Sequence, residues 1–205
     1  MMWPLLLCSI SSLAIIFEKA FFFSSVEKEI LVLKDQVIGA VRKGDMKAAV
    51  AFCDAVNSPL SGILRAGLLH FGKGKTEIKD AMEGASSAQV NFLEQGVSFL
   101  GALGSVAPLL GFLGTIMAMG LSMRTFQLRL QAMNPAAFQD IVGDVWAALI
   151  TTAFGLLIAI PIFLAYHYFT SRIFDIVFQM ERAAMDLTVA LMDLSGTSSL
   201  EGDEA

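Results

Sequence analysis

Charged residues are missing from three stretches of the chain, and this pattern sets the expected architecture. Residues 96–123 and 145–171 contain no Asp, Glu, Lys or Arg. A helix that spans a bilayer needs about 20 mostly apolar residues, so both stretches are long enough. Residues 1–17 are also uncharged but shorter. A helix can span there if Glu18 and Lys19 sit at the interface or against other helices. The pattern predicts three transmembrane helices.

The distribution of basic residues predicts the orientation of these helices. Most Lys and Arg residues lie between the first two apolar stretches, and the positive-inside rule places that part in the cytoplasm. The N-terminus is then periplasmic and the C-terminus cytoplasmic. We assign residues 1–23, 96–125 and 143–170 to transmembrane helices, 24–95 to a cytoplasmic helical region, 126–142 to a short periplasmic connector, 171–194 to a cytoplasmic helix and 195–205 to a disordered tail.

The cytoplasmic region shows helical periodicity. Residues 26–56 carry one apolar stripe at spacings of three and four, which predicts a single helix. Asn57-Ser58-Pro59 ends it, because a residue before proline avoids the helical conformation. A second helix follows over residues 60–71, and Thr76 is the expected cap of a third. The third helix has no clear breaker before Pro108, so we expect it to run directly into the second span.

The same periodicity continues beyond the third span. Residues 171–194 repeat apolar positions at three and four, so the third span is expected to extend into a cytoplasmic helix. Long helices that project from a membrane cannot bury their apolar faces alone. We therefore expect an all-α, three-span protein whose helices extend into a cytoplasmic bundle and whose chains assemble with one another.

Composition narrows the function classes. Hydrophobic residues make up 56% and charged residues 16%, with a mean hydropathy of +0.68, whereas a soluble domain averages about 25% charged residues. The net charge of −5 provides no basic footprint for nucleic acid. Cys8 and Cys53 lie far apart, which argues against a disulfide framework or a thiolate metal site. We find no nucleophile constellation or phosphate loop, and expect neither an enzyme nor a cofactor.

A cleaved signal peptide is the alternative interpretation of the N-terminus. Such a signal has a positive n-region and a small-residue cleavage site. Met1-Met2-Trp3-Pro4 carries no basic side chain, and Phe21-Phe22-Phe23 is a poor cleavage site. We therefore expect a retained transmembrane helix.

Small and weakly polar residues form a stripe along each long span. The first stripe comprises Gly111, Thr115, Ala118 and Ser122, and the second Ala148, Thr152, Gly155 and Ala159. Small residues let helices approach closely in lipid, so packing is the common use of such stripes. Two facing stripes repeated in a ring would instead line a narrow cavity. We expect packing roles for Gly104, Gly114, Gly155 and Pro161.

Carboxylates are absent from the middle of the long spans. An ionisable group within a span is the usual mark of a proton path, and here Asp140 and Asp144 lie only at the outer start of the third span. Asp144 falls roughly on the face of Ala148. The interpretation that we favour is a solvated carboxylate in the first helical turn, stabilised by the helix dipole. A part in a proton path is the alternative.

Motifs in all three spans resemble one known family. Ala107–Ile116 reads Ala-Pro-Leu-Leu-Gly-Phe-Leu-Gly-Thr-Ile, and Ala148–Leu156 is followed by Ala159-Ile160-Pro161. These segments are similar to the second- and third-span signatures of the ExbB/TolQ/MotA proton-channel family, in its ExbB-like branch. Trp3–Ser9 leading to Ile15–Lys19 is similar to the family's first span. The resemblance covers nearly the whole chain, with the motifs in the same order and spacing.

The resemblance implies a partner-dependent proton motor. Such proteins form a homopentamer in the bacterial inner membrane around a single-span ExbD- or TolR-like partner, whose span carries an aspartate. Proton flow drives a TonB- or TolA-like effector, and so outer-membrane transport or envelope maintenance. By position, Thr115 and Thr152 match the family's pore-lining threonines. With Gly111, Ala148 and Asp144 they form the proton-pathway candidates that we carry forward.

One position departs from the family pattern. Many ExbB-like relatives carry a glutamate where this chain has Ala147. Asp144 could stand in for that carboxylate, or the partner's aspartate could suffice. A membrane scaffold that assembles but does not conduct is therefore the alternative function. Which transport or motility system would be energised stays open.

Overall fold

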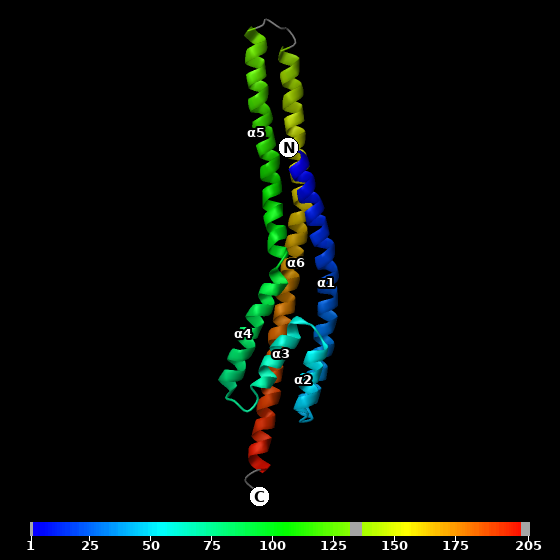
Figure 1. The fold of residues 1–205 in the computed structure, drawn as a ribbon, viewed down its shortest axis with the longest axis vertical. Coiled ribbons are helices and arrows are strands. Elements are labelled where there is room, and N and C mark those ends of the chain that lie inside the picture. Colours follow the sequence, from blue (N-terminus) through cyan, green and yellow to red (C-terminus); the bar gives the residue numbers. More distant parts are fainter. Residues whose placement is uncertain (1, 132–136, 202–205) are drawn as a thin grey trace. The chain divides into compact units, whose positions relative to one another are not determined.

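The structure is a computed structural model that describes the backbone of residues 2–131 and 137–201. Every regular element in these ranges is a helix, which confirms the predicted all-α class (Figure 1). Three helical stretches are long and apolar enough to cross a membrane, as expected. The helices are α1 (Met2–Arg42), α2 (Met46–Ala55), α3 (Pro59–Leu69), α4 (Lys75–Glu94), α5 (Val97–Gln131) and α6 (Ala137–Glu201).

The helices form two compact units, and α1 and α6 contribute to both. The first unit consists of Met1–Lys19 and Gly96–Phe169, and the second of Ala20–Gln95 and Thr170–Ala205. The first unit therefore contains the start of α1, all of α5 and the first part of α6. The second contains the three short helices α2, α3 and α4 with the remainders of α1 and α6.

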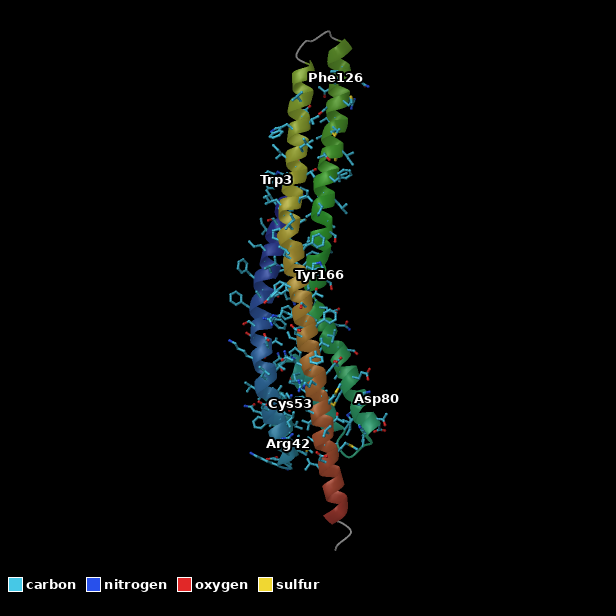
Figure 2. All side chains as sticks on the ribbon, turned by 180° about the vertical axis from the view of Figure 1, so that it is seen from behind. Trp3, Arg42, Cys53, Asp80, Phe126 and Tyr166 are labelled. Atoms are coloured by element: carbon cyan, nitrogen blue, oxygen red, sulfur yellow. The ribbon has the colours of Figure 1, made fainter. Side chains whose placement is uncertain are left out.

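The first unit has the character of a membrane-embedded domain. α5 and the first part of α6 lie side by side, and the start of α1 lies beside α6 in both views (Figures 1 and 2). Large apolar side chains such as Leu109 and Leu157 point outward, and apolar residues on all sides are typical of a helix that faces lipid. The buried side chains of this unit include Leu5, Leu100, Ala107, Ala148, Ala159, Ile162 and Phe169.

The second unit is an amphipathic helical bundle. α3 packs against both α2 and α4, and the predicted stripe of α1 supplies the fully buried Ile30, Leu33 and Val37. Ion pairs link α1 to α6, with Lys34 Nζ 2.7 Å from Asp186 and Arg172 3.4 Å from Glu27. Further core residues are Leu60, Ile63, Leu64, Ile78, Leu93, Met180, Leu187 and Leu191.

Cys53 belongs to this core. Its side chain is buried on α2. Burial, helped by the neighbouring Asp54 carboxylate and partly opposed by Arg65, raises the pKa of the Cys53 thiol to about 11. The thiol is therefore protonated at neutral pH, and it behaves as a small apolar side chain rather than as a nucleophile.

A turn at Gly44 divides the helix that we expected over residues 26–56. α1 ends at Arg42, Gly44 has a φ of +77°, and Asp45 caps α2 by accepting a hydrogen bond from the Ala48 amide at 3.0 Å. Glycine adopts this left-handed conformation without the steric cost that other residues meet. The prediction of a single helix was wrong, because the stripe continues across the turn.

The expected passage of the third cytoplasmic helix into the second span is also wrong. α4 ends at Glu94, and Gly96 has a φ of +82° before α5 begins at Val97. A Cβ on Gly96 would lie 2.9 Å from Lys19 Cε. At the other end of α4 the N-cap residue is Gly74, without a side-chain cap, so Thr76 is inside the helix and does not cap it.

The long helices extend beyond their expected bounds. α5 reaches Gln131 and α6 begins at Ala137, so most of the connector expected at 126–142 is helical, and residues 132–136 lie outside the described ranges. α6 continues through Pro161 into the second unit, which confirms that the third span extends into a further helix. It reaches Glu201, past the expected end at residue 194, and 202–205 are not described.

We predict opposite effects of alanine at Gly84, which lies inside α4, and at Gly96, which lies between α4 and α5. Gly96→Ala should destabilise the protein by roughly 1–2 kcal/mol, because alanine resists the left-handed conformation. Gly84→Ala is the matched control, since Gly84 is inside α4 with open space around its Cβ position, and it should stabilise by about 0.5–1 kcal/mol. The measurement is the free energy of unfolding in detergent. Equal stabilisation by both changes would contradict the break at Gly96.

Candidate functional site

α5 and α6 come into backbone contact along a line of mostly small residues, centred on Ala107 and Gly111 of α5 and Thr151 and Gly155 of α6. We call the contact along this line the seam. A Cβ on Gly155 would lie 3.0 Å from both the Gly111 Cα and the Ala107 carbonyl oxygen. A Cβ on Gly111 would lie 3.3 Å from the Gly155 Cα and the Thr151 carbonyl oxygen. Only residues without a large side chain permit this approach. The two stripes predicted from the sequence therefore do face each other, within one chain.

The seam has a single antiparallel register. Gly111 meets Gly155, Gly104 meets Ile162, and Ser122 meets Asp144; the two residue numbers of each pair add up to 266. Antiparallel helices that rise equally per residue keep such a sum constant along their length. The register then places Ala118 level with Ala148, Thr115 level with Thr151, and Ala107 level with Ala159.

The expected packing residues occupy different places. Gly104 and Gly155 are buried in the seam, and Gly114 is buried on α5. Tyr166 of α6 extends the contact beyond them, since a Cβ on Gly101 would lie 2.8 Å from its ring (Figure 2). The side chain of Pro161 is exposed, so the packing role that we expected for it is not in the seam of this chain.

The expected pathway residues Gly111 and Ala148 are buried in the seam. In a single chain they pack helix against helix. Thr152 is half-buried, and its hydroxyl donates across the seam to the Gly111 carbonyl oxygen at 3.2 Å. It therefore departs from the usual bonding of a threonine to its own helix.

Two other threonines follow the usual pattern. The Thr115 hydroxyl donates to the Phe112 carbonyl oxygen at 2.7 Å, and that of Thr151 to the Ala147 carbonyl oxygen at 3.0 Å. Both residues are half-buried and lie in the same layer of the seam. Each hydroxyl keeps free acceptor capacity. This layer is the most polar part of the seam between Asp144 and Gly111.

Asp144 lies at the end of the seam that is nearest the connector. Its Oδ2 is 2.7 Å from the Ser122 hydroxyl of α5, and Ser122 is buried. α6 begins at Ala137, so Asp144 is not in the first turn, where the helix dipole acts. The predicted place in the first turn was therefore wrong, because the helix starts earlier than expected. The side chain is exposed, as expected of a solvated carboxylate, but it also has a partner across the seam.

Ser122 was expected in the stripe, but its bond to Asp144 was not predicted, and Thr151 was not among the expected pathway residues. The antiparallel alignment of α5 with α6 would have indicated both. Once Gly111 is aligned with Gly155 in an antiparallel pair, Ser122 falls opposite Asp144 and Thr115 opposite Thr151. Among the residues that the structure describes, no cluster of His, Cys, Asp and Glu has the arrangement of a metal site.

Comparisons with known proteins find a matching family and several relatives. The sequence model of the MotA/TolQ/ExbB proton channel family matches residues 55–182. An ExbB-like biopolymer transport protein of Synechocystis is 30% identical over 82% of this chain and 79% of its own length. TolQ, a Tol-Pal system protein of Pseudomonas aeruginosa, is 25% identical over 83% of this chain and 77% of its own length.

A relative from Methanothermobacter thermautotrophicus, named as an ExbB homologue in biopolymer transport, is 31% identical over 71% of this chain. The match covers 52% of that protein, so the chain spans about half the length of this relative.

We predict that the seam does not tolerate a methyl group at Gly155. Gly155→Ala should destabilise the detergent-solubilised protein by roughly 1–3 kcal/mol, because the new Cβ meets backbone atoms that cannot rotate away. Gly120→Ala on α5 is the matched control, since no atom lies within 4 Å of its Cβ position. It should be neutral or slightly stabilising. An unfolding titration in which both variants match the wild type would refute the close approach.

Proposed function

Because the chain belongs to the MotA/TolQ/ExbB proton channel family, we propose that it is the multi-pass subunit of a proton-driven motor. In this proposal it lies in the bacterial inner membrane, with a periplasmic N-terminus and a cytoplasmic C-terminus. Several copies, five by analogy with the family, surround a single-span partner of the ExbD or TolR type. The assembly converts the proton motive force into work on a TonB- or TolA-like effector, for outer-membrane transport or envelope maintenance.

The observation that carries the proposal is the weakly polar seam between two apolar helices. Thr115, Thr151 and Thr152 supply hydroxyls where the flanking surface is apolar, and Asp144 supplies a carboxylate at one end. The described parts of α5 and α6 hold no carboxylate deeper in the span. A conducting assembly therefore takes its deep proton carrier from the partner, which is the role of the partner's aspartate.

A non-conducting scaffold is the second candidate. Two observations favour it: position 147 is alanine, and Gly111 and Gly155 are in contact, which leaves no space between α5 and α6 at that level. A scaffold would assemble in the same way but would carry no protons. The two candidates differ in one measurable property, the proton permeability of vesicles that contain the chain and its partner.

Removal of the two threonine hydroxyls tests the pathway. Thr115→Val with Thr152→Val should lower partner-dependent proton influx into vesicles severalfold, because valine keeps the shape but offers no hydrogen bond. Assembly should be unaffected, which the mass of the solubilised complex checks. Ser105→Ala is the control, since this exposed hydroxyl of α5 bonds only its own helix, at the Gly101 carbonyl oxygen. Full influx in the double variant would assign the stripe to packing alone.

A further inference from the structure

The outer side of α6 in the second unit carries four large apolar side chains that are 60% to 71% exposed. We call this row the ridge, and it consists of Phe174, Phe178, Met185 and Val189. Their spacing along the chain places them on one side of the helix. The core residues Met180 and Leu187 lie on the opposite side and are fully buried. In the second unit, α6 therefore has two apolar sides, of which only one is packed within the chain.

Lipid does not account for the ridge. In the proposed orientation the second unit lies in the cytoplasm, and its helices are amphipathic, with polar outer sides such as that of α4. The two phenylalanines of the ridge alone expose roughly 200–300 Å². Apolar patches of a few hundred Å² on a water-facing surface mark sites of protein contact. The ridge is therefore expected to be covered by another protein surface.

Carboxylates outnumber basic side chains around the ridge. On the exposed side of α6, Arg182 is accompanied by Asp175, Glu181, Asp186 and Asp193. A groove of about 390 Å³ between α1 and α6 adds Asp35 to this surface, together with Lys34 and Arg42. Lys34 is already used, since it pairs with Asp186 at 2.7 Å. A surface that covers the ridge must therefore be apolar and must not add carboxylates.

The contacts within the second unit show which residues lie at the same level. α1 and α6 run in the same direction (Figure 1), and the groove brings Ile38 together with Val189. Residues of α6 thus lie level with residues of α1 numbered about 150 lower. α2 runs back along α1 after the turn at Gly44, where the Asp45 amide donates to the Ala40 carbonyl oxygen at 3.1 Å.

The exposed side of α2 fits the ridge in shape, charge and level. Ala51 and Ala55 are exposed and Ala48 is half-buried on this side, which makes it flat and apolar. Counting back from the turn places Ala48 level with Val189 and Ala51 level with Met185. We call these three alanines the alanine surface.

The charges beside the alanine surface are also suitable. Lys47 is exposed next to Ala48. The exposed Asp54 carboxylate is paired with Arg65 at 2.9 Å. Lys47 would therefore face the acidic surroundings of the ridge, and Asp54 would add no unpaired charge.

α4 is the less suitable surface. Its Met82 sulfur accepts a hydrogen bond from the Thr188 hydroxyl at 3.8 Å, so the residues around Met82 share the level of the lower half of the ridge. The exposed residues there include Asp80 and Glu83. Placing α4 against the ridge would bring these carboxylates next to an acidic surface, and like charges in a contact disfavour it.

We propose that the ridge packs against the alanine surface of a second copy of this chain. The inference rests on the assembly of several copies in the proposed function, and it adds the surfaces that join the copies outside the spans. The two surfaces are different patches, so the contact is heterologous. Because the paired residues are level, repeating the contact gives no rise along the helices. It therefore closes into a ring instead of growing into a filament.

A disulfide between the two surfaces tests the proposal. The full-length chain with Cys8→Ser keeps only the buried Cys53. In this background, Ala51→Cys with Met185→Cys should give a ladder of linked chains on a non-reducing denaturing gel after mild oxidation. Met185→Cys alone should run as a monomer. Ser87→Cys with Met185→Cys is the matched control, because Ser87 is an exposed small residue of α4, and it should also run as a monomer.

Added charge provides an independent measurement. Met185→Glu with Val189→Glu should lose the full native mass of the solubilised particle, because the contact would bury two unpaired carboxylates. Ser87→Glu with Asn91→Glu, on the exposed side of α4, is the matched control and should keep that mass. All four residues are exposed, so thermal unfolding followed by circular dichroism should confirm that both variants fold. A ridge variant that assembles fully would show that the ridge is not an interface.

The gel separates the possible contacts. A ladder from Met185→Cys alone would join ridge to ridge, and a ladder from the Ser87 pair would join ridge to α4; either result overturns the proposal. A particle of several copies without the expected link ends this inference alone. A linked ring that does not conduct with its partner ends the proposed motor instead and leaves the interface in place. A monomeric wild-type particle contradicts both.

Discussion

The contact of α5 with α6 through residues that lack large side chains is the constraint on which the rest of the first unit depends. Gly111 and Gly155 bring the two backbones together, and Ala107, Ala148 and Ala159 are buried in the adjoining layers. This fixes one register, and the register fixes the polar pairs. Ser122 meets Asp144, and Thr152 reaches the Gly111 carbonyl oxygen, as a consequence of how the glycines align.

In the proposed motor, one chain alone does not form a complete channel. Its small-residue stripes cover each other, whereas many large apolar side chains of α5 and α6 remain exposed. In the proposed assembly, lipid, neighbouring copies and the partner's span cover those surfaces. In that proposal the half-buried threonine hydroxyls and the carboxylate of Asp144 form the pathway at the edge of the seam, where they meet the partner.

The helical architecture and the break at Asn57-Ser58-Pro59 were predictable, and the turns at Gly44 and Gly96 were not. The uncharged stretches identified the spans, because lipid excludes charged side chains. The apolar stripe of α1 identified one buried face of the second unit, because burial of one side of a helix produces a periodic pattern. The turns at Gly44 and Gly96 produce no such pattern. From the sequence alone, a glycine in the left-handed conformation cannot be distinguished from Gly84, which lies inside α4. The two facing stripes were found, but Asp144 was assigned to a first turn because the start of α6 is not marked by composition.

In the proposed motor, the chain works only as part of a larger ring with a second protein. The most direct test is the mass of the detergent-solubilised particle by native mass spectrometry, with and without a single-span partner that carries an aspartate in its span. A pentamer whose mass rises when partner chains are added is the expected result. A monomer or dimer of unchanged mass in the presence of the partner would contradict the account and leave the seam as ordinary helix packing.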